Sequence, residues 1–193
     1  LKVDPYSSAF TDFGGRTAGL KGQDVIYELP IHLEDIVKTK EKTISYNFGG
    51  KHQQIRVKIP AGIGNGKKLR LAGKGQPGPE GGPPGDLYIK IKILDHPIFQ
   101  RQGDDLYMNR AIKFSEAALG AKIEVPTIDG KRLSLKIPAG AQSGSKMRLR
   151  SCGMPRMDGG GIGDAYVKIQ VAVPKKLNKK QRALLEERKD SDL

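Results

Sequence analysis

The sequence is poor in cysteine and has no tryptophan among its 193 residues. Its single cysteine, Cys152, cannot form an internal disulfide or a cysteine-rich zinc site. This usage is typical of a reducing compartment, so we expect a cytoplasmic protein. No apolar run approaches the roughly 20 residues of a membrane-spanning helix, so we expect no membrane partner. The first residue, Leu1, is not a methionine, and we therefore expect a piece of a longer chain.

Motifs for catalysis and cofactor binding are also missing. Residues 73–78 match a glycine-rich phosphate-binding pattern, but proline and glycine follow where a helix would have to begin. The three histidines have no second ligand at metal spacing, and no nucleophile elbow is present. We therefore expect a binding module that is not an enzyme and needs no cofactor and no metal.

An internal repeat organises the chain. Residues 55–93 align without a gap with residues 133–171, and 18 of the 39 aligned positions are identical. Further upstream the offset between the copies is slightly larger, because Ile31 there lies opposite Ile112. This change predicts a length difference in the intervening hairpin. We therefore divide the chain into a linker (1–23), two similar domains (24–98 and 99–173) and a C-terminal segment (174–193).

Apolar and polar residues alternate within each copy of the repeat, as in residues 55–59, which is typical of strands with one buried face. The 25 glycines and 12 prolines mark turns between such strands. We predict a mainly β protein with two tandem, similar β-sandwich or open-barrel domains whose strands are antiparallel. Single helical turns are expected at 33–37 and 114–119. A C-terminal α-helix is expected over 178–189, with Asn178 and Gln181 as a capping box.

Several motifs resemble the C-terminal region of DnaJ-type co-chaperones, also called J-domain proteins. The resemblance covers residues 24–189, and residues before 22 are similar to the family's Gly/Phe linker. The family's four Cys-x-x-Cys-x-Gly-x-Gly repeats are absent, and a short hairpin at 47–50 stands in their place. The chain is therefore similar to the zinc-free subclass, and residues 43–46 resemble the bacterial curved-DNA-binding type. The motifs that carry the resemblance are VKIPAG (57–62), LAGKG (71–75), GDLY (85–88) and FQRQGDDLY (99–107).

The resemblance implies a protein that binds hydrophobic segments of non-native polypeptides and holds them for transfer to a DnaK-type chaperone. The site would be an exposed apolar groove beside the first two strands of the first domain. The alternative, that the same side chains form the core, stays open. Our candidate peptide-binding residues are Tyr27, Leu29, Ile31, Ile44, Tyr46, Phe48 and Phe99.

The formal net charge of +13 is compatible with a polyanionic partner. Lys38, Lys40 and Lys42 could hold the acidic tail of a DnaK-type chaperone, or they could bind DNA phosphates. The alternative function is therefore a nucleoid-associated, sequence-tolerant DNA-binding protein, and a merely solvated lysine-rich face is a third reading. The resemblance also implies a homodimer formed through the C-terminal helix. The candidate dimerisation residues are Gln181, Leu184, Leu185 and Arg188.

Overall fold

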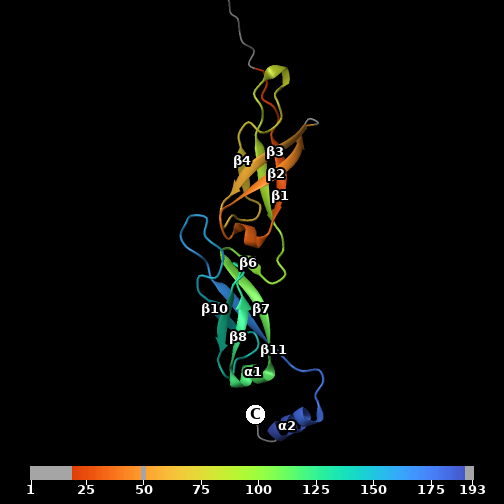
Figure 1. Ribbon diagram of the computed structural model, residues 1–193, viewed down its shortest axis with the longest axis vertical. Coiled ribbons are helices and arrows are strands. Elements are labelled where there is room, and N and C mark those ends of the chain that lie inside the picture. The colour runs from red at the N-terminus through yellow and green to blue at the C-terminus, as the bar shows by residue number, and fades with distance from the viewer. Residues whose placement is uncertain (1–18, 49–50, 190–193) are drawn as a thin grey trace, which may run out of the picture.

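The structure is a computed structural model that describes residues 19–48 and 51–189 (Figure 1). The prediction of a mainly β chain is confirmed, and the strands form several open sheets. The first copy of the repeat contains β1 (Val25–Ile31), β2 (Lys40–Phe48), β3 (Lys51–Ile59), β4 (Lys68–Leu71) and β5 (Leu87–Ile93). The second copy contains β6 (Gln100–Gln102), β7 (Asp105–Lys113), β8 (Ala121–Pro126), β9 (Arg132–Ile137), β10 (Lys146–Leu149) and β11 (Ala165–Ala172).

Short helices accompany these strands. The predicted helical turns are confirmed as the 3-10 helix η1 (Leu33–Ile36) and as α1 (Phe114–Leu119). A second 3-10 turn, η2 (Pro79–Gly81), lies in the long loop between β4 and β5. The helix α2 (Lys179–Lys189) follows the second copy and is drawn beyond its α1 end in Figure 1. Within the described residues, none of the helices has the length and apolar character needed to cross a membrane.

Each copy combines one larger sheet with one hairpin. The first copy has the strand order β1-β5-β4 and the separate hairpin β2-β3, and the second has β10-β11-β7-β6 and β8-β9. The expectation of antiparallel strands is wrong for one pair in each copy, because β1 lies parallel to β5 and β7 lies parallel to β11. In both cases the chain passes through the hairpin before it returns, so the two paired strands run in the same direction.

The strand registers preserve the repeat residue by residue. Val25 pairs with Leu87 in the first copy, and their equivalents Leu106 and Ala165 pair in the second. The hairpins account for the change of offset, because β2-β3 extends to the pair Phe48–Lys51 whereas β8-β9 ends at Pro126–Arg132. The length difference therefore lies in the hairpin, as the change of offset predicts.

Alternate residues of the paired strands form the core. Ile89 and Ile91 are fully buried in the first copy, and Val167 and Ile169 are fully buried in the second. The core therefore lies on the inner face of the strands that carry the repeat.

An aspartate closes the long loop in each copy. Asp86, which is buried, accepts from the Gly73 N–H at 2.9 Å and pairs with Arg70 at 2.7 Å. Asp164, which is half-buried, accepts in the same way from the Ser151 N–H at 2.8 Å and pairs with Arg148 at 2.8 Å. The repeat thus preserves this carboxylate together with its two kinds of partner.

The predicted capping box of the C-terminal helix is confirmed. Asn178 Oδ1 accepts from the Gln181 N–H at 2.7 Å, and Gln181 Oε1 accepts from the Asn178 N–H at 3.0 Å. These two bonds satisfy amide groups that have no partner within the helix. Within the described part of the chain, none of the side chains of α2 is buried.

Candidate functional site

Strand β1 is an edge strand whose outer side is open. It pairs with β5 alone, and no other ladder partner exists among residues 19–48 and 51–189. The Val25 N–H donates to the Asp86 carbonyl at 2.8 Å, and the Ile31 carbonyl accepts from the Leu94 N–H at 2.9 Å. Because backbone groups alternate in direction along a strand, Ile26 and Glu28 point their N–H and C=O groups away from β5.

Strand β2 begins beside the end of β1. Lys42 Nζ donates to the Pro30 carbonyl at 3.3 Å, which joins the two strands at that point. β2 pairs only with β3, so its other edge also has no ladder partner in the described part of the chain. Pro30 has no N–H and its carbonyl is occupied by Lys42, so the open part of the β1 edge lies at Ile26 and Glu28.

The prediction of an exposed apolar groove beside β1 and β2 is wrong, because most of its candidate side chains are buried. Leu29 and Ile44 are each 3% exposed, and Ile31 is not exposed at all. Tyr46 is buried, and its hydroxyl donates to Gln53 Oε1 at 2.9 Å. These side chains belong to one core between the β1 sheet and the β2-β3 hairpin, because both elements bury the same apolar face. Whether they contact a peptide stays a prediction, but they do not form an open groove here.

The remaining candidates of this set lie in three different settings. Tyr27 is half-buried and packs against the core. The side chain of Phe48 lies outside the described residues. Phe99 is buried between the two copies, where its ring lies 5.0 Å from that of His96. The structure therefore does not bring Phe99 together with the β1 and β2 residues on one surface.

Sequence reasoning missed Ile26, which is the apolar side chain that β1 exposes. Its exposed fraction is 61%, and it lies on the face of β1 opposite the core. The alternation predicts one apolar face, made of Val25, Tyr27, Leu29 and Ile31, and Ile26 does not belong to that face. Its signal in the sequence is an apolar residue at a position where the alternation predicts a polar one.

The three candidate lysines differ in what they contact. Lys40 Nζ pairs with Asp35 Oδ1 at 2.8 Å, and this bond holds the pKa of the Asp35 carboxyl below its usual value. Lys42 contacts the Pro30 carbonyl, as described above. Lys38 is exposed and has no ion-pair partner among the described residues. Two of the three ammonium groups are therefore already engaged within the first copy.

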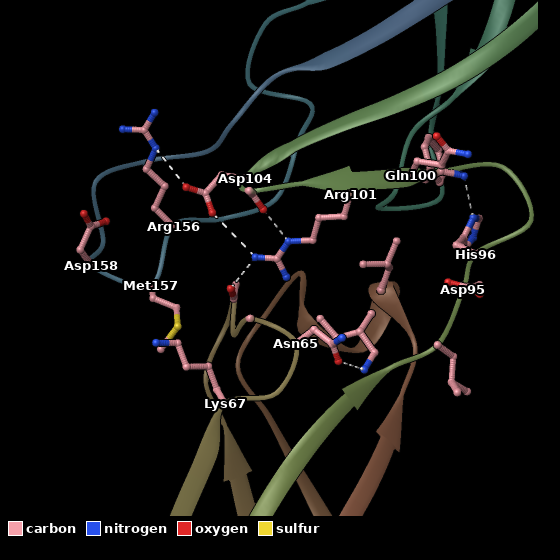
Figure 2. Close-up of a pocket in the computed structure, with 17 residues that line it drawn as sticks. Asn65, Lys67, Asp95, His96, Gln100, Arg101, Asp104, Arg156, Met157 and Asp158 are labelled. Carbon is pink, nitrogen blue, oxygen red and sulfur yellow. Dashed lines mark hydrogen bonds and ion pairs between the residues drawn. The ribbon is translucent and has the colours of Figure 1, made fainter.

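A cleft of about 950 Å³ lies at the junction between the two copies (Figure 2). The turn after β3 and the segment after β5 line one part of it, and the β6-β7 hairpin and the 156–158 loop line the other. Arg101 extends from β6 across this cleft toward the first copy (Figure 2). Arg101 lies in the motif at 99–107 that carries the resemblance, but the sequence assigned no role to this side chain.

The structure contains no metal-binding arrangement in its described part, because no three His, Cys, Asp or Glu side chains converge there. Cys152 is half-buried, and burial raises the pKa of its thiol. The dimerisation candidates Gln181, Leu184, Leu185 and Arg188 are all exposed on α2. The geometry therefore offers open strand edges and an exposed helix, which are elements that bind polypeptides.

Comparison with known proteins finds a matching family model and several similar proteins. The profile of the DnaJ C terminal domain matches residues 25–174. Chaperone protein DnaJ of Leptospira biflexa is 50% identical over 137 residues, which cover 71% of this chain and 36% of that protein. Chaperone protein DnaJ of a Geobacillus species is 53% identical over 151 residues, which cover 77% of this chain and 40% of that protein. The chain therefore spans no more than about two fifths of the curated relatives that it matches.

Proposed function

Because the chain belongs to the DnaJ C-terminal domain family, we propose that it binds exposed hydrophobic segments of non-native polypeptides as part of a co-chaperone. We further propose that it holds these segments for transfer to a DnaK-type chaperone. This role needs no enzymatic step by the chain itself. The zinc-free subclass and a cytoplasmic location belong to the same proposal.

The open outer edge of β1 is the observation that carries this proposal. An extended client segment that lies along this edge would hydrogen-bond to the outward N–H and C=O groups of Ile26 and Glu28. Such pairing uses only backbone groups, so it tolerates many client sequences. Exposed Ile26 offers an apolar contact for a client side chain.

The strength of such binding is modest. Each client side chain that becomes buried contributes about 1.5–3 kcal/mol, so three contribute roughly 5–9 kcal/mol. Ordering a flexible client segment costs about 2–5 kcal/mol of that gain. The remainder is at most about 7 kcal/mol, which corresponds to dissociation constants no tighter than roughly 10 micromolar and suits transient holding.

The open edge of the second copy differs from that of the first in its position and in its side chains. β6 pairs antiparallel with β7 from Gln100–Tyr107 to Gln102–Asp105, so the chain itself covers the first half of that edge. By the same alternation that governs β1, Asn109 and Ala111 keep open outward groups on the uncovered part of β7, whereas the Lys113 N–H is bonded to Glu116 Oε2. Neither Asn109 nor Ala111 offers a large exposed apolar side chain such as that of Ile26. We therefore place the main client site on the first copy.

Proline at Glu28 is the variant that tests this site. Glu28→Pro removes an outward N–H and leaves the bonds between β1 and β5 in place. We expect it to reduce the suppression of aggregation of an unfolded model client. Asn109→Pro is the matched control, because the repeat places Asn109 at the position of β7 that is equivalent to Glu28 in β1. We expect this control to retain most of the activity.

A second control separates the backbone effect from the loss of charge. Glu28 pairs with Lys90 at 3.4 Å and with Lys92 at 3.5 Å, and Glu28→Ala removes these pairs without removing the N–H. Full activity in a folded Glu28→Pro variant would contradict the proposal, as would equal losses in Glu28→Pro and Asn109→Pro. Thermal unfolding of each variant establishes that it is folded.

Two further roles were expected of the candidate lysines, namely contact with the acidic tail of a DnaK-type chaperone and binding of DNA. Contact of Lys38, Lys40 and Lys42 with the acidic tail of a DnaK-type chaperone stays a prediction. The contacts of Lys40 with Asp35 and of Lys42 with the Pro30 carbonyl disfavour the alternative function of DNA binding.

We also propose that the chain forms a homodimer through α2. The helix buries no side chain of its own, and Leu184 and Leu185 are exposed to 53% and 42%. Gln181 and Arg188 lie one turn before and after these leucines on the same face. A dimer would present two client sites to one unfolded chain and raise its avidity without new contacts.

A further inference from the structure

We propose that Arg101 and Gly62 form a clamp that holds the second copy of the repeat in one orientation against the first. The proposal concerns the junction between the copies and does not depend on where a client binds. Arg101 belongs to β6 of the second copy, and Gly62 belongs to the turn after β3 of the first copy.

All three nitrogen atoms of the Arg101 guanidinium group donate hydrogen bonds to backbone carbonyls. Nη2 donates to Gly62 O at 2.7 Å and Nη1 donates to Ile63 O at 2.8 Å, both in the first copy. Nε donates to Gly103 O at 2.7 Å in the second copy. The planar guanidinium group therefore joins the two copies by three bonds of fixed direction.

The clamp is sheltered from solvent. The Arg101 side chain is 13% exposed, and its nearest carboxylate, Asp104, lies 3.7 Å from Nη2. Burial lowers the pKa of Arg101, and Asp104 only partly opposes this effect. Asp104 is also 3.8 Å from Arg156 (Figure 2). The backbone of Arg156 and of the preceding Pro155 lies against Gly62. The positive charge of Arg101 is therefore stabilised at the junction mainly by three carbonyl groups and less by the carboxylate of Asp104.

Gly62 brings the two backbones together on the other side of the clamp. A Cβ atom at Gly62 would lie 1.9 Å from the Pro155 carbonyl oxygen of the second copy. The Gly62 N–H donates to the Ile36 carbonyl at 2.8 Å, which anchors the same turn to η1. No side chain fits between the turn and the 155–156 backbone, so only glycine permits this contact.

The repeat supplies an internal comparison for each half of the clamp. Gly140 aligns with Gly62 in the same turn of the second copy and has a similar φ, 76° against 71°. Nothing lies within 4 Å of a Cβ atom placed on Gly140. Leu20 stands before β1 where Arg101 stands before β7, and it is 77% exposed. The clamp therefore occurs once in the described chain, at the junction, and is not a property of the repeated unit.

Distances between spin labels on the two copies test the clamp in the 193-residue chain. The labels are attached at Gln54→Cys and Ser134→Cys, two exposed strand positions, in a Cys152→Ser background. We expect a single narrow distance distribution for the reference. Arg101→Ala and Arg101→Lys should both lose the narrow peak, because alanine has no donor and lysine lacks the planar fork that bonds Gly62, Ile63 and Gly103 together. Arg148→Ala, which removes an ion pair within the second copy, should retain it.

The glycine pair tests the same proposal independently of the arginine. Gly62→Ala and Gly140→Ala incur similar backbone strain, because both residues have positive φ. Only Gly62→Ala should shift or broaden the distribution. The proposal is overturned if folded Arg101→Ala keeps the narrow peak. If Arg101→Ala does not fold, equal distributions for the two glycine variants overturn it and a change confined to Gly62→Ala supports it.

Discussion

At the scale of single residues, the two equivalent aspartates Asp86 and Asp164 show how one carboxylate closes a long loop between two strands. In each copy the carboxylate accepts a backbone N–H at the start of the loop and pairs with an arginine of the preceding strand. The hydrogen bond from Gly73, followed by those from Arg70 and Lys21, lowers the pKa of Asp86. The bond from Ser151 chiefly lowers the pKa of Asp164, and Arg148 adds to it.

These lowered pKa values predict a stability that depends on acidity. A carboxyl whose pKa is lower in the folded chain stabilises it fully above the unfolded value, which is about 3.9 for aspartate. That contribution is lost as the pH falls through the folded pKa. We therefore expect the free energy of unfolding to change little through these groups at neutral pH and to fall below about pH 4.

Asp86→Asn provides the check on this prediction. The variant should be less stable than the unsubstituted chain at neutral pH. The difference should shrink in acid, because the unfolded carboxyl takes up a proton below about pH 4 whereas the folded one takes it up only at a lower pH. Urea unfolding at about pH 7 and about pH 3 measures it. Asp164→Asn should behave alike in the second copy. Asp86 would not be a source of the acid dependence if the free energy of unfolding fell by the same amount from about pH 7 to about pH 3 in Asp86→Asn and in the unsubstituted chain.

At the scale of elements, strands and helices differ in how far the sequence predicts their roles. Alternation in residues 25–31 correctly indicates a strand with one apolar face. It does not indicate what covers that face, because this depends on how the β2-β3 hairpin packs on the sheet. Leu29, Ile31 and Ile44 are therefore core residues and not an open groove. The parallel pairing of β1 with β5 is likewise a property of the crossover and has no local signal.

Local chemistry made other elements predictable. The capping box at Asn178, the helical turns after β1 and β7, and the offset between the hairpins all arise from residues close in sequence. Arg101 had no such signal, because its partners Gly62 and Ile63 are distant in sequence. Contacts of this kind become visible only when the two copies are placed together.

The helix α2 carries a prediction of its own. Leu184→Asp should weaken the proposed dimer, because each buried leucine contributes about 1.5–3 kcal/mol and occurs twice in a symmetric interface. The dimer dissociation constant should rise by about 100-fold or more. Sedimentation equilibrium measures it. Ala183→Asp adds the same charge on the opposite face of the helix and should leave the dimer intact. A monomeric unsubstituted chain, or equal effects of the two variants, would contradict the proposal.

At the scale of the whole molecule, two copies of one unit have different surroundings. The first copy leaves the outer edge of β1 open at Ile26 and Glu28, and the second copy covers Tyr107, the equivalent of Ile26, with β6. β6 is also the strand that carries Arg101 into the junction. The same short strand thus connects the copies and occupies an edge, which explains why two similar domains need not bind clients equally.

Hydrogen exchange of the β1 amides, with and without an unfolded client, tests the central claim most directly. The outward N–H groups of Ile26 and Glu28 have no ladder partner in the described part of the chain, so a client strand that pairs with this edge should slow their exchange. The outward groups of Asn109 and Ala111 on the uncovered part of β7 should change less. Client binding that leaves the exchange of Ile26 and Glu28 unchanged, or that protects β7 instead, would contradict the account.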